Sequence, residues 1–277
     1  MLRAFWGVIM KRTIAFIAAA LVAGAASAQQ PLMFGHQNFD TSPTELYSDF
    51  EGLTSLLSKA LKQPVRFESV KKVDAYLERT ADHRYTVIFA PPSVVAAAVK
   101  RDGYEPIAKI PGSLAPVFMA MSRSQVAFIE DMKGKRLGTT HEDSMMTRLG
   151  MLHLRNRGID PQKYFSEVRH FADVNAVIFA LAHNMIDVGL ANSTLYDYWT
   201  SRGYDLTLIE QGPGAPNLTF AVRGDLPENE KRAILQALLN APKDPEASMY
   251  FRKAGFPGVE PASMKDYSEL VKRLEIK

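Results

Sequence analysis

The sequence predicts an α/β protein whose mostly parallel sheets are covered by helices. The first observation is a repeated alternation of short apolar segments with amphipathic segments, which is the order of β-α-β units. The second is the composition, because 47% hydrophobic and 23% charged residues over 277 positions suit one large or two smaller globular domains. The third is the end of the chain, which has a helical pattern throughout after Pro227.

The first long helix has the most explicit signals. Ser42-Pro43-Thr44-Glu45 has the form of a capping box with proline at the first helical position. Apolar residues then recur at helical spacing and predict one buried face, made of Leu46, Phe50, Leu53, Leu57 and Leu61. Further helices are predicted from Ser93 and over 144–157, 174–183 and 193–201.

Strands are predicted between these helices, at 32–35, 65–70, 85–90, 106–110, 116–121, 136–139, 168–171, 187–191, 206–209 and 218–222. Between the last two lies the densest turn cluster, Gly212-Pro213-Gly214-Ala215-Pro216. This cluster is either a crossing between two lobes or a plain surface loop, and the sequence favours neither.

The first 28 residues have the three parts of a cleaved export signal. A basic start ending at Lys11-Arg12 is followed by the apolar segment 13–25 and then by Ala26-Ser27-Ala28, an A-x-A cleavage site. A membrane anchor is the alternative, but the uncharged run is short for a span. An apolar patch before Lys11 leaves Met1 and Met10 both open as the start. We therefore expect export to the periplasm.

Charge and cysteine content narrow the function. The chain has 33 Lys+Arg and 30 Asp+Glu, and removal of the three basic residues of the leader leaves 30 against 30. A net charge of zero gives no reason to expect nucleic-acid binding. With no cysteine there is no disulfide, no thiolate metal site, no cysteine nucleophile and no lipid-attachment cysteine, so we expect a free periplasmic protein and not a lipoprotein.

No catalytic motif stands out in the sequence. The chain has no G-x-S-x-G, H-E-x-x-H, G-x-G-x-x-G or P-loop pattern, and its six histidines are scattered. Glu142 and Asp143 look like paired carboxylates, but at a helix start they more simply complement the helix dipole. We therefore expect no enzyme activity, no metal and no cofactor.

Polar or small residues follow five of the predicted strands. In open parallel sheets, ligands bind beyond the carboxyl ends of the strands, where helix N-termini present unpaired N–H groups. The five junctions are at 36–39, 89–93, 139–144, 173–175 and 192–193. One such junction is usually only a helix cap, but five in one chain predict a ligand cleft.

Four sequence runs resemble the phosphonate-type periplasmic substrate-binding proteins of ABC importers. Asp131–Leu137 (DMKGKRL) resembles their D-L-K-G-K-R-V, and Arg155–Pro161 (RNRGIDP) resembles the K-x-A-G-I-D-P that follows it. Tyr85–Ser93 (YTVIFAPPS) is similar to their Y-D-x-x-x-x-G-P-x-S segment, and Arg223–Pro227 (RGDLP) to their R-x-D-L-P. The four runs stand in the family's order and span nearly all of the chain after the leader.

The resemblance implies a type II periplasmic-binding fold with two lobes joined by two strand crossings, near 116–121 and 217–222. Lobe 1 would comprise 29–118 and 218–277, and lobe 2 would comprise 119–217. It also implies capture of a small ligand such as a phosphonate or phosphite, delivery to a membrane permease, and a monomer. A sensor kinase as the partner is the first alternative. The second is an enzyme on the same fold with His141 as base.

Family members that bind phosphonate carry two turns that this chain lacks. Their S-T-S turn corresponds to Asp143–Thr147, where two methionines replace hydroxyl residues, and their S-H-D turn corresponds to Asp173-Val174-Asn175. The acidic residue that pairs with an aminophosphonate's amine corresponds to Asn192. Because fewer donors and an added carboxylate weaken an anion site, we expect the ligand not to be 2-aminoethylphosphonate. A less charged or partly apolar solute, or a small oxyanion held by backbone N–H groups, fits better.

We predict eight ligand-binding residues. Phe89 is expected to form an apolar wall, Ser144 and nearby N–H groups to hold a polar head, and the Asn175 and Asn192 amides to read orientation. The full set is His36, Asn38, Phe89, Thr140, His141, Ser144, Asn175 and Asn192.

Overall fold

The computed structural model describes residues 31–37 and 43–276. The predicted leader and Asn38 lie outside the described residues. The α-helices of the described part are α2 (Pro43–Leu61), α3 (Val73–Ala81), α4 (Pro92–Asp102), α5 (Met145–Asn156), α6 (Pro161–Tyr164), α7 (Val174–Ala182), α8 (Ser193–Ser201), α9 (Glu228–Asn240), α10 (Ser248–Lys253) and α11 (Met264–Arg273). None of these described helices is long and apolar enough to span a bilayer.

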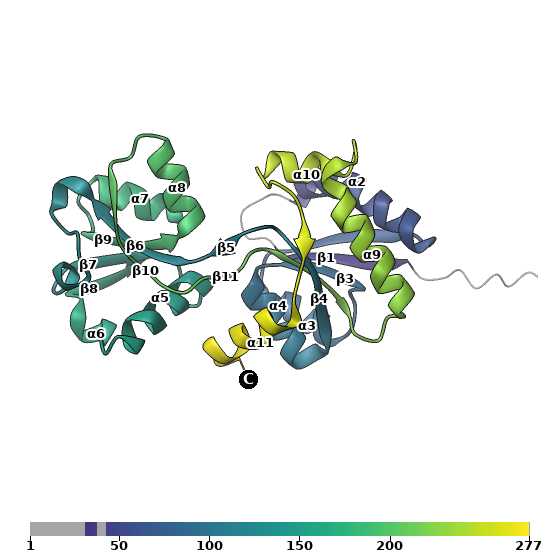
Figure 1. The fold of residues 1–277 in the computed structure, drawn as a ribbon, viewed down its shortest axis with the longest axis horizontal. Coiled ribbons are helices and arrows are strands. Elements are labelled where there is room, and N and C mark those ends of the chain that lie inside the picture. Colours follow the sequence, from purple (N-terminus) through teal and green to yellow (C-terminus); the bar gives the residue numbers. More distant parts are fainter. Residues whose placement is uncertain (1–30, 38–42, 277) are drawn as a thin grey trace, which may run out of the picture. The chain divides into compact units, whose positions relative to one another are not determined.

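Two sheets organise the described chain (Figure 1). The six-stranded sheet has the order β13-β4-β12-β3-β1-β2, and the five-stranded sheet has the order β10-β6-β9-β7-β8. The first sheet contains β1 (Leu32–Gln37), β2 (Val65–Val70), β3 (Val87–Ala90), β4 (Tyr104–Lys109), β12 (Thr219–Arg223) and β13 (Glu260–Pro261). The second contains β6 (Pro116–Met121), β7 (Arg136–Thr139), β8 (Glu167–His170), β9 (Val188–Asn192) and β10 (Leu206–Gln211). We call each sheet with its helices the first and the second lobe.

The chain passes between the lobes twice, through the short strands β5 (Ser113–Leu114) and β11 (Ala215–Pro216). These two strands pair antiparallel with each other, so the turn cluster at 212–216 is a crossing and not a plain loop. All of β6 pairs within the second sheet, so residues 116–118 belong to the second lobe, and the sheet begins three residues before the predicted boundary.

Each sheet is parallel except where the chain has just crossed and at the short β13, which is antiparallel to β4. β12 is antiparallel to β3 and β4, and β6 is antiparallel to β9 and β10. The register is informative, because Pro116 at the start of β6 pairs with Asn192 at the end of β9, and Thr219 at the start of β12 pairs with Ala90 at the end of β3. In both lobes, therefore, the parallel strands end at the edge where the crossing strand enters.

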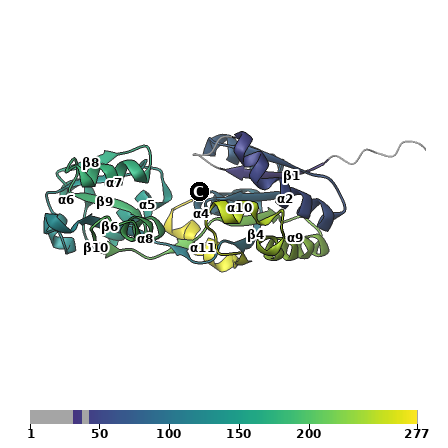
Figure 2. The ribbon, with the colours of Figure 1, turned by 90° about the horizontal axis from the view of Figure 1, so that it is seen from above.

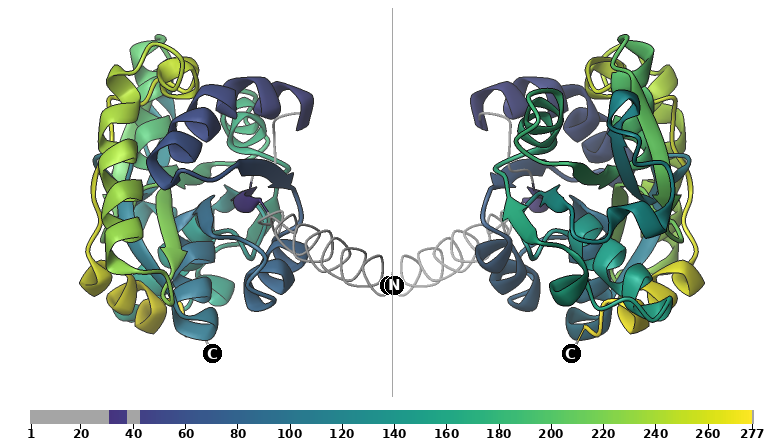
Figure 3. Two further views of the ribbon diagram at one scale, coloured as in Figure 1. Left: turned by 90° about the vertical axis from the view of Figure 1, so that its right-hand side faces the viewer. Right: turned by 90° about the vertical axis from the view of Figure 1, so that its left-hand side faces the viewer.

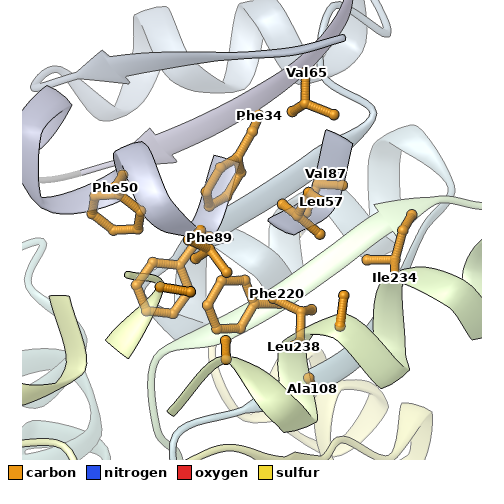
Figure 4. Packing of buried hydrophobic residues seen from close by; sticks show 14 of the residues in the cluster. Phe34, Phe50, Leu57, Val65, Val87, Phe89, Ala108, Phe220, Ile234 and Leu238 are labelled. Carbon is orange, nitrogen blue, oxygen red and sulfur yellow. The ribbon is translucent and has the colours of Figure 1, made fainter. Parts of the chain in front are cut away.

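Helices cover both faces of the first sheet (Figure 3). On one face α2, α9 and α10 enclose a cluster of aromatic and aliphatic side chains, and on the other α3, α4 and α11 enclose a second cluster rich in tyrosine. In the first cluster the rings of Phe89 and Phe220 stack with centroids 4.0 Å apart, close to Phe34 and Phe50 (Figure 4). The predicted apolar positions of α2 reach this cluster, with Leu46, Phe50, Leu53 and Leu57 buried.

Most predicted elements occur within a few residues of their predicted bounds. Five of the helices and strands named above were not predicted: α3, whose sequence VDAYLERTA has a weak apolar pattern, and the short elements α6, β5, β11 and β13. β13, two residues long, lies inside the C-terminal segment predicted as purely helical. α4 begins at Pro92, one residue before the predicted start at Ser93, and its N-cap Pro91 makes no side-chain cap.

Candidate functional site

A chain of four hydroxyl groups lies where β7 ends and α5 begins. Thr139 Oγ1 lies 2.6 Å from Thr147 Oγ1, which lies 2.8 Å from Ser144 Oγ, which lies 2.8 Å from Thr140 Oγ1. Ser144 is also the N-cap of α5, because its Oγ accepts a hydrogen bond from the Thr147 backbone N–H at 3.3 Å. We call the segment Thr140–Thr147 the binding turn.

The hydroxyl chain can present one proton outward. Four hydroxyls carry four protons, and each of the three contacts between them uses one. Thr139 and Thr147 are buried, whereas Thr140 and Ser144 are half-buried. If every hydroxyl donates toward the surface, the order is Thr139 to Thr147 to Ser144 to Thr140, and the Thr140 proton is left for a ligand. Together with the N-terminal N–H groups of α5, this arrangement suits a small oxyanion.

His170, at the end of β8, adds a third element to the binding turn. Its Nδ1 lies 2.9 Å from the Thr140 carbonyl oxygen, which can only accept, so Nδ1 carries the proton. In the neutral imidazole Nε2 is then an acceptor. Thr139, Thr147 and His170 are not in the predicted set. Thr147 is recognisable in hindsight, because the third residue after an N-cap serine is the one that faces it.

A pocket of about 390 Å³ lies beside the binding turn. Thr147 and His170 line it, together with Arg148 and Arg155 from the exposed side of α5 and with Arg273 from the end of α11. Three carboxylate residues, Glu142, Asp143 and Glu275, also line it, so its formal charge is balanced.

The other two strand ends of the second lobe carry helix caps. Asp173 Oδ1 accepts from the Ala176 N–H at 2.8 Å, and Asn192 Oδ1 accepts from the Leu195 N–H at 2.9 Å. The amide oxygen of Asn192 therefore binds its own helix, and its Nδ2 group is the hydrogen-bond donor that remains for a ligand. Asn175 is exposed in the first turn of α7.

His141 stands on the solvent side of the binding turn. Its side chain is 74% exposed, and its Nδ1 lies 3.7 Å from Asp143 Oδ2. Within residues 31–37 and 43–276 there is no group of three or more potential metal-ligating side chains, at His141 or elsewhere.

The structure places His36 and Phe89 in the core of the first lobe. Both are almost completely buried, and the His36 Nδ1–H donates to the Phe89 carbonyl oxygen at 2.8 Å. Their rings are stacked with centroids 5.1 Å apart, and burial lowers the pKa of His36 from its ordinary value to about 4. Because β3 lies between β12 and β1 and all four of its residues are buried, Phe89 is a core residue and not an exposed ligand wall.

Gln37, the last residue of β1, is a polar side chain buried in the first lobe. Its Nε2–H donates to the Lys71 carbonyl oxygen at 2.9 Å, and its Oε1 has no hydrogen-bond partner within the described residues. Nothing in the sequence distinguishes Gln37 from its neighbours, because glutamine at the end of a strand is common.

Met145 and Met146 pack away from the hydroxyl chain. Both contact a buried cluster that contains Leu149 of α5 and Leu270 and Leu274 near the end of the chain. The two methionines that depart from the family's hydroxyl-rich turn thus contribute to packing within the protein.

A protein-family model described as the periplasmic substrate-binding protein of phosphonate ABC transporters matches residues 39–267. No curated protein sequence matches the chain.

Several solved structures share the fold at low sequence identity. XAC2383 from Xanthomonas citri, bound to ATP, superposes with a TM-score of 0.72 at 14% identity, over 89% of this chain and 98% of that one. PhnD1 from Prochlorococcus marinus, in complex with methylphosphonate, superposes with a TM-score of 0.69 at 16% identity, over 90% and 99%. A binding-protein component of an ABC phosphonate transporter from Pseudomonas aeruginosa gives 0.66 at 17% identity, over 89% and 86%.

Proposed function

Because the chain belongs to the periplasmic substrate-binding proteins of phosphonate ABC transporters, we propose that its binding turn holds the head group of the solute that it captures. The family match confirms the resemblance predicted from the four sequence runs. It assigns the chain to ligand capture for an importer, with the permease as membrane partner and the periplasm as compartment. Two of the candidate residues, Thr140 and Ser144, are the half-buried members of the hydroxyl chain.

The observation that carries this proposal is the hydroxyl chain at the N-terminus of α5. A ligand that accepts the Thr140 proton keeps all three internal hydrogen bonds. The ligand class is a small oxyanion without an ammonium group, because Asn192 stands where the family has an acid and its oxygen already caps α8. The PhnD1 complex with methylphosphonate makes methylphosphonate the natural first probe.

Thermal-shift and calorimetric titrations of the chain from Gln29 onward test the proposal. The probes are methylphosphonate, phosphite, phosphate and 2-aminoethylphosphonate. A ligand at a hundred times its dissociation constant stabilises the fold by about 2.7 kcal/mol, and we expect this with methylphosphonate or phosphite. Binding of 2-aminoethylphosphonate in the nanomolar range would contradict the ligand class.

Variants locate the site. Thr140→Val removes the hydrogen bond to the charged head group, so we expect roughly a tenfold or larger loss of affinity, equivalent to about 1.5–3 kcal/mol. Ser144→Ala removes the internal donor to Thr140, so it should also weaken binding, but by less. Ser201→Ala is the matched control, because Ser201 is an exposed hydroxyl at the C-terminal end of α8. Unchanged affinity in both variants would place the head group elsewhere.

The chain does no chemistry on its ligand. His141, the base in the enzymatic alternative, is exposed and faces a carboxylate. Phosphorus NMR of methylphosphonate incubated with the protein should show the compound intact, and a new phosphorus signal that His141→Ala abolishes would favour an enzyme.

The exported form is a monomer cleaved after Ala28 and carries no lipid. Intact-mass measurement and light scattering of the periplasmic protein check all three points. A sensor kinase is the alternative partner, and co-purification of the ligand-bound chain with either membrane protein distinguishes the two.

A further inference from the structure

The C-terminal helix α11 packs against the first lobe. Tyr267 is completely buried in the tyrosine-rich cluster, and its hydroxyl is hydrogen-bonded to the hydroxyl of Thr219 at the start of β12. The helix packs along α4 and reaches β11 (Figures 1 and 2).

The last turn of α11 is fixed to the crossing. The Arg273 guanidinium donates to two carbonyl oxygens of the turn before β11, that of Gly214 at 2.6 Å and that of Pro213 at 2.8 Å. Leu270 and Leu274 are buried against Ala215 of β11. The helix end therefore moves with the first lobe and with the crossing strand.

The same helix end contacts the second lobe through α5. Leu149 lies in the buried cluster with Leu270 and Leu274, and Met145 and Met146 pack against it. The Arg148 Nη2 group donates to the carbonyl oxygen of Leu274, the C-cap of α11. This contact places a cation on the unpaired carbonyl at a helix C-terminus, where the helix dipole favours it.

The two sides of the first turn of α5 thus have different partners. Ser144 and Thr147 join the hydroxyl chain, whereas Met145, Arg148 and Leu149 meet α11. Residues three and four apart share a helix face, so Ser144 and Thr147 form one stripe, and Met145 lies on the next with Arg148 and Leu149. Arg148 also follows Ser144 by four residues and therefore lies at the border of the two stripes.

We propose that Arg148 is a positioning residue that ties the binding turn to the C-terminal helix and so sets the resting angle of the second lobe. Rotation of the lobes about β5 and β11 is the hinge motion that ligand capture uses. Since α11 is held by the first lobe and by the crossing, such a rotation must shear its contacts with α5. The effect on ligand affinity rests on the function proposed for the binding turn, whereas the effect on the resting angle does not.

The chain has no cysteine, so two labels can be placed freely. Lys59→Cys on α2 and Lys163→Cys on α6, both exposed, carry spin labels for distance measurement between the lobes by pulsed electron resonance. In the ligand-free protein, Arg148→Met should broaden the distribution of distances between the two labels. Arg148→Lys should give a distribution nearly as narrow as that of the unsubstituted protein, because a hydrogen-bond donor remains. Arg155→Met is the matched control, since Arg155 lies two turns further along the same exposed face of α5.

Calorimetry with methylphosphonate adds a second readout. Because a loosened turn must be ordered by the ligand, Arg148→Met should weaken binding by roughly fivefold, the low end of coupling between sites. An Arg148→Met distance distribution identical to that of the unsubstituted protein would overturn the proposal, whether or not methylphosphonate binds. Failure of methylphosphonate to bind, with the distribution broadened as expected, would instead count against the proposed ligand and leave the positioning role supported.

Discussion

The two sheets end their parallel strands at equivalent edges, but they use those edges differently. In the second lobe the helices that follow β7, β8 and β9 all have side-chain caps, from Ser144, Asp173 and Asn192. In the first lobe neither α3 nor α4 has one, and the side chains of His36 and Phe89 are part of the core.

This difference shows how one strand-end position can serve packing or recognition. The Phe89 ring stacks on Phe220 in the middle of a sheet, and its burial stabilises the fold by about 1.5–3 kcal/mol. This stabilisation requires that the ring stays packed against other apolar side chains and does not face water or a ligand. A hydroxyl at a helix start instead satisfies N–H groups and keeps a proton for exchange with solvent or ligand.

The largest expected effect tests the first half of this comparison. Phe89→Ala should lower the free energy of unfolding by about 3–5 kcal/mol, because it opens a cavity in the aromatic cluster. Urea denaturation measures the loss. Phe128→Ala is the matched control, because that ring is 69% exposed and should change stability by less than about 0.5 kcal/mol. A stable Phe89 variant with lost ligand affinity would return this residue to the binding site.

The pH dependence of stability should come next in size. The folded pKa of His36 is lowered to about 4 by burial, so between about pH 6.5 and pH 4 the unfolded chain binds a proton that the folded chain does not. Stability should therefore fall as the pH drops through this window, by up to about 3 kcal/mol, and not further below it. Urea denaturation at several pH values gives the free energy of unfolding as a function of pH. This free energy should depend less steeply on pH in His36→Asn, whereas His183→Asn, at an exposed position, should show the same pH dependence as the unsubstituted protein.

The helices were predicted well where the spacing of apolar residues agreed with the residues that cap or end a helix. Serine, proline and glutamate marked the start of α2, and five apolar residues at helical spacing marked its buried face. Ser144 and Gly158 bracketed α5, and Gly158 has the left-handed φ of 78° that favours glycine after a helix. α3 has no comparable signal, because its N-cap Lys72 makes no side-chain bond and its buried residues are only Tyr76 and Thr80.

The candidate site was harder to predict, for a physical reason. The position of a residue just after a predicted strand led to Thr140 and Ser144, which are members of the hydroxyl chain. The same criterion also led to His36 and Phe89, which are buried in the core, because it does not distinguish buried from exposed residues. The alternation of β1 contained the missing information, because Phe34 and His36 are two apart and face the same aromatic cluster. Which hydroxyls meet Ser144 depends on how the end of β7 faces the first turn of α5, a tertiary relation that spacing alone does not give.

The smallest expected effect separates a cap from a ligand group. Asp173→Ala removes the bond to the Ala176 N–H and should cost about 1 kcal/mol of stability, whereas Asp173→Asn keeps an acceptor and should cost a few tenths. Because Asp173 acts only as a cap, methylphosphonate affinity should be the same in both variants once stability is accounted for. Ser144 is a cap and also a member of the hydroxyl chain, so Ser144→Ala should lose both stability and affinity. If Asp173→Asn instead tightens binding several-fold, the carboxylate repels the bound anion, and the strand end of β8 belongs to the ligand site after all.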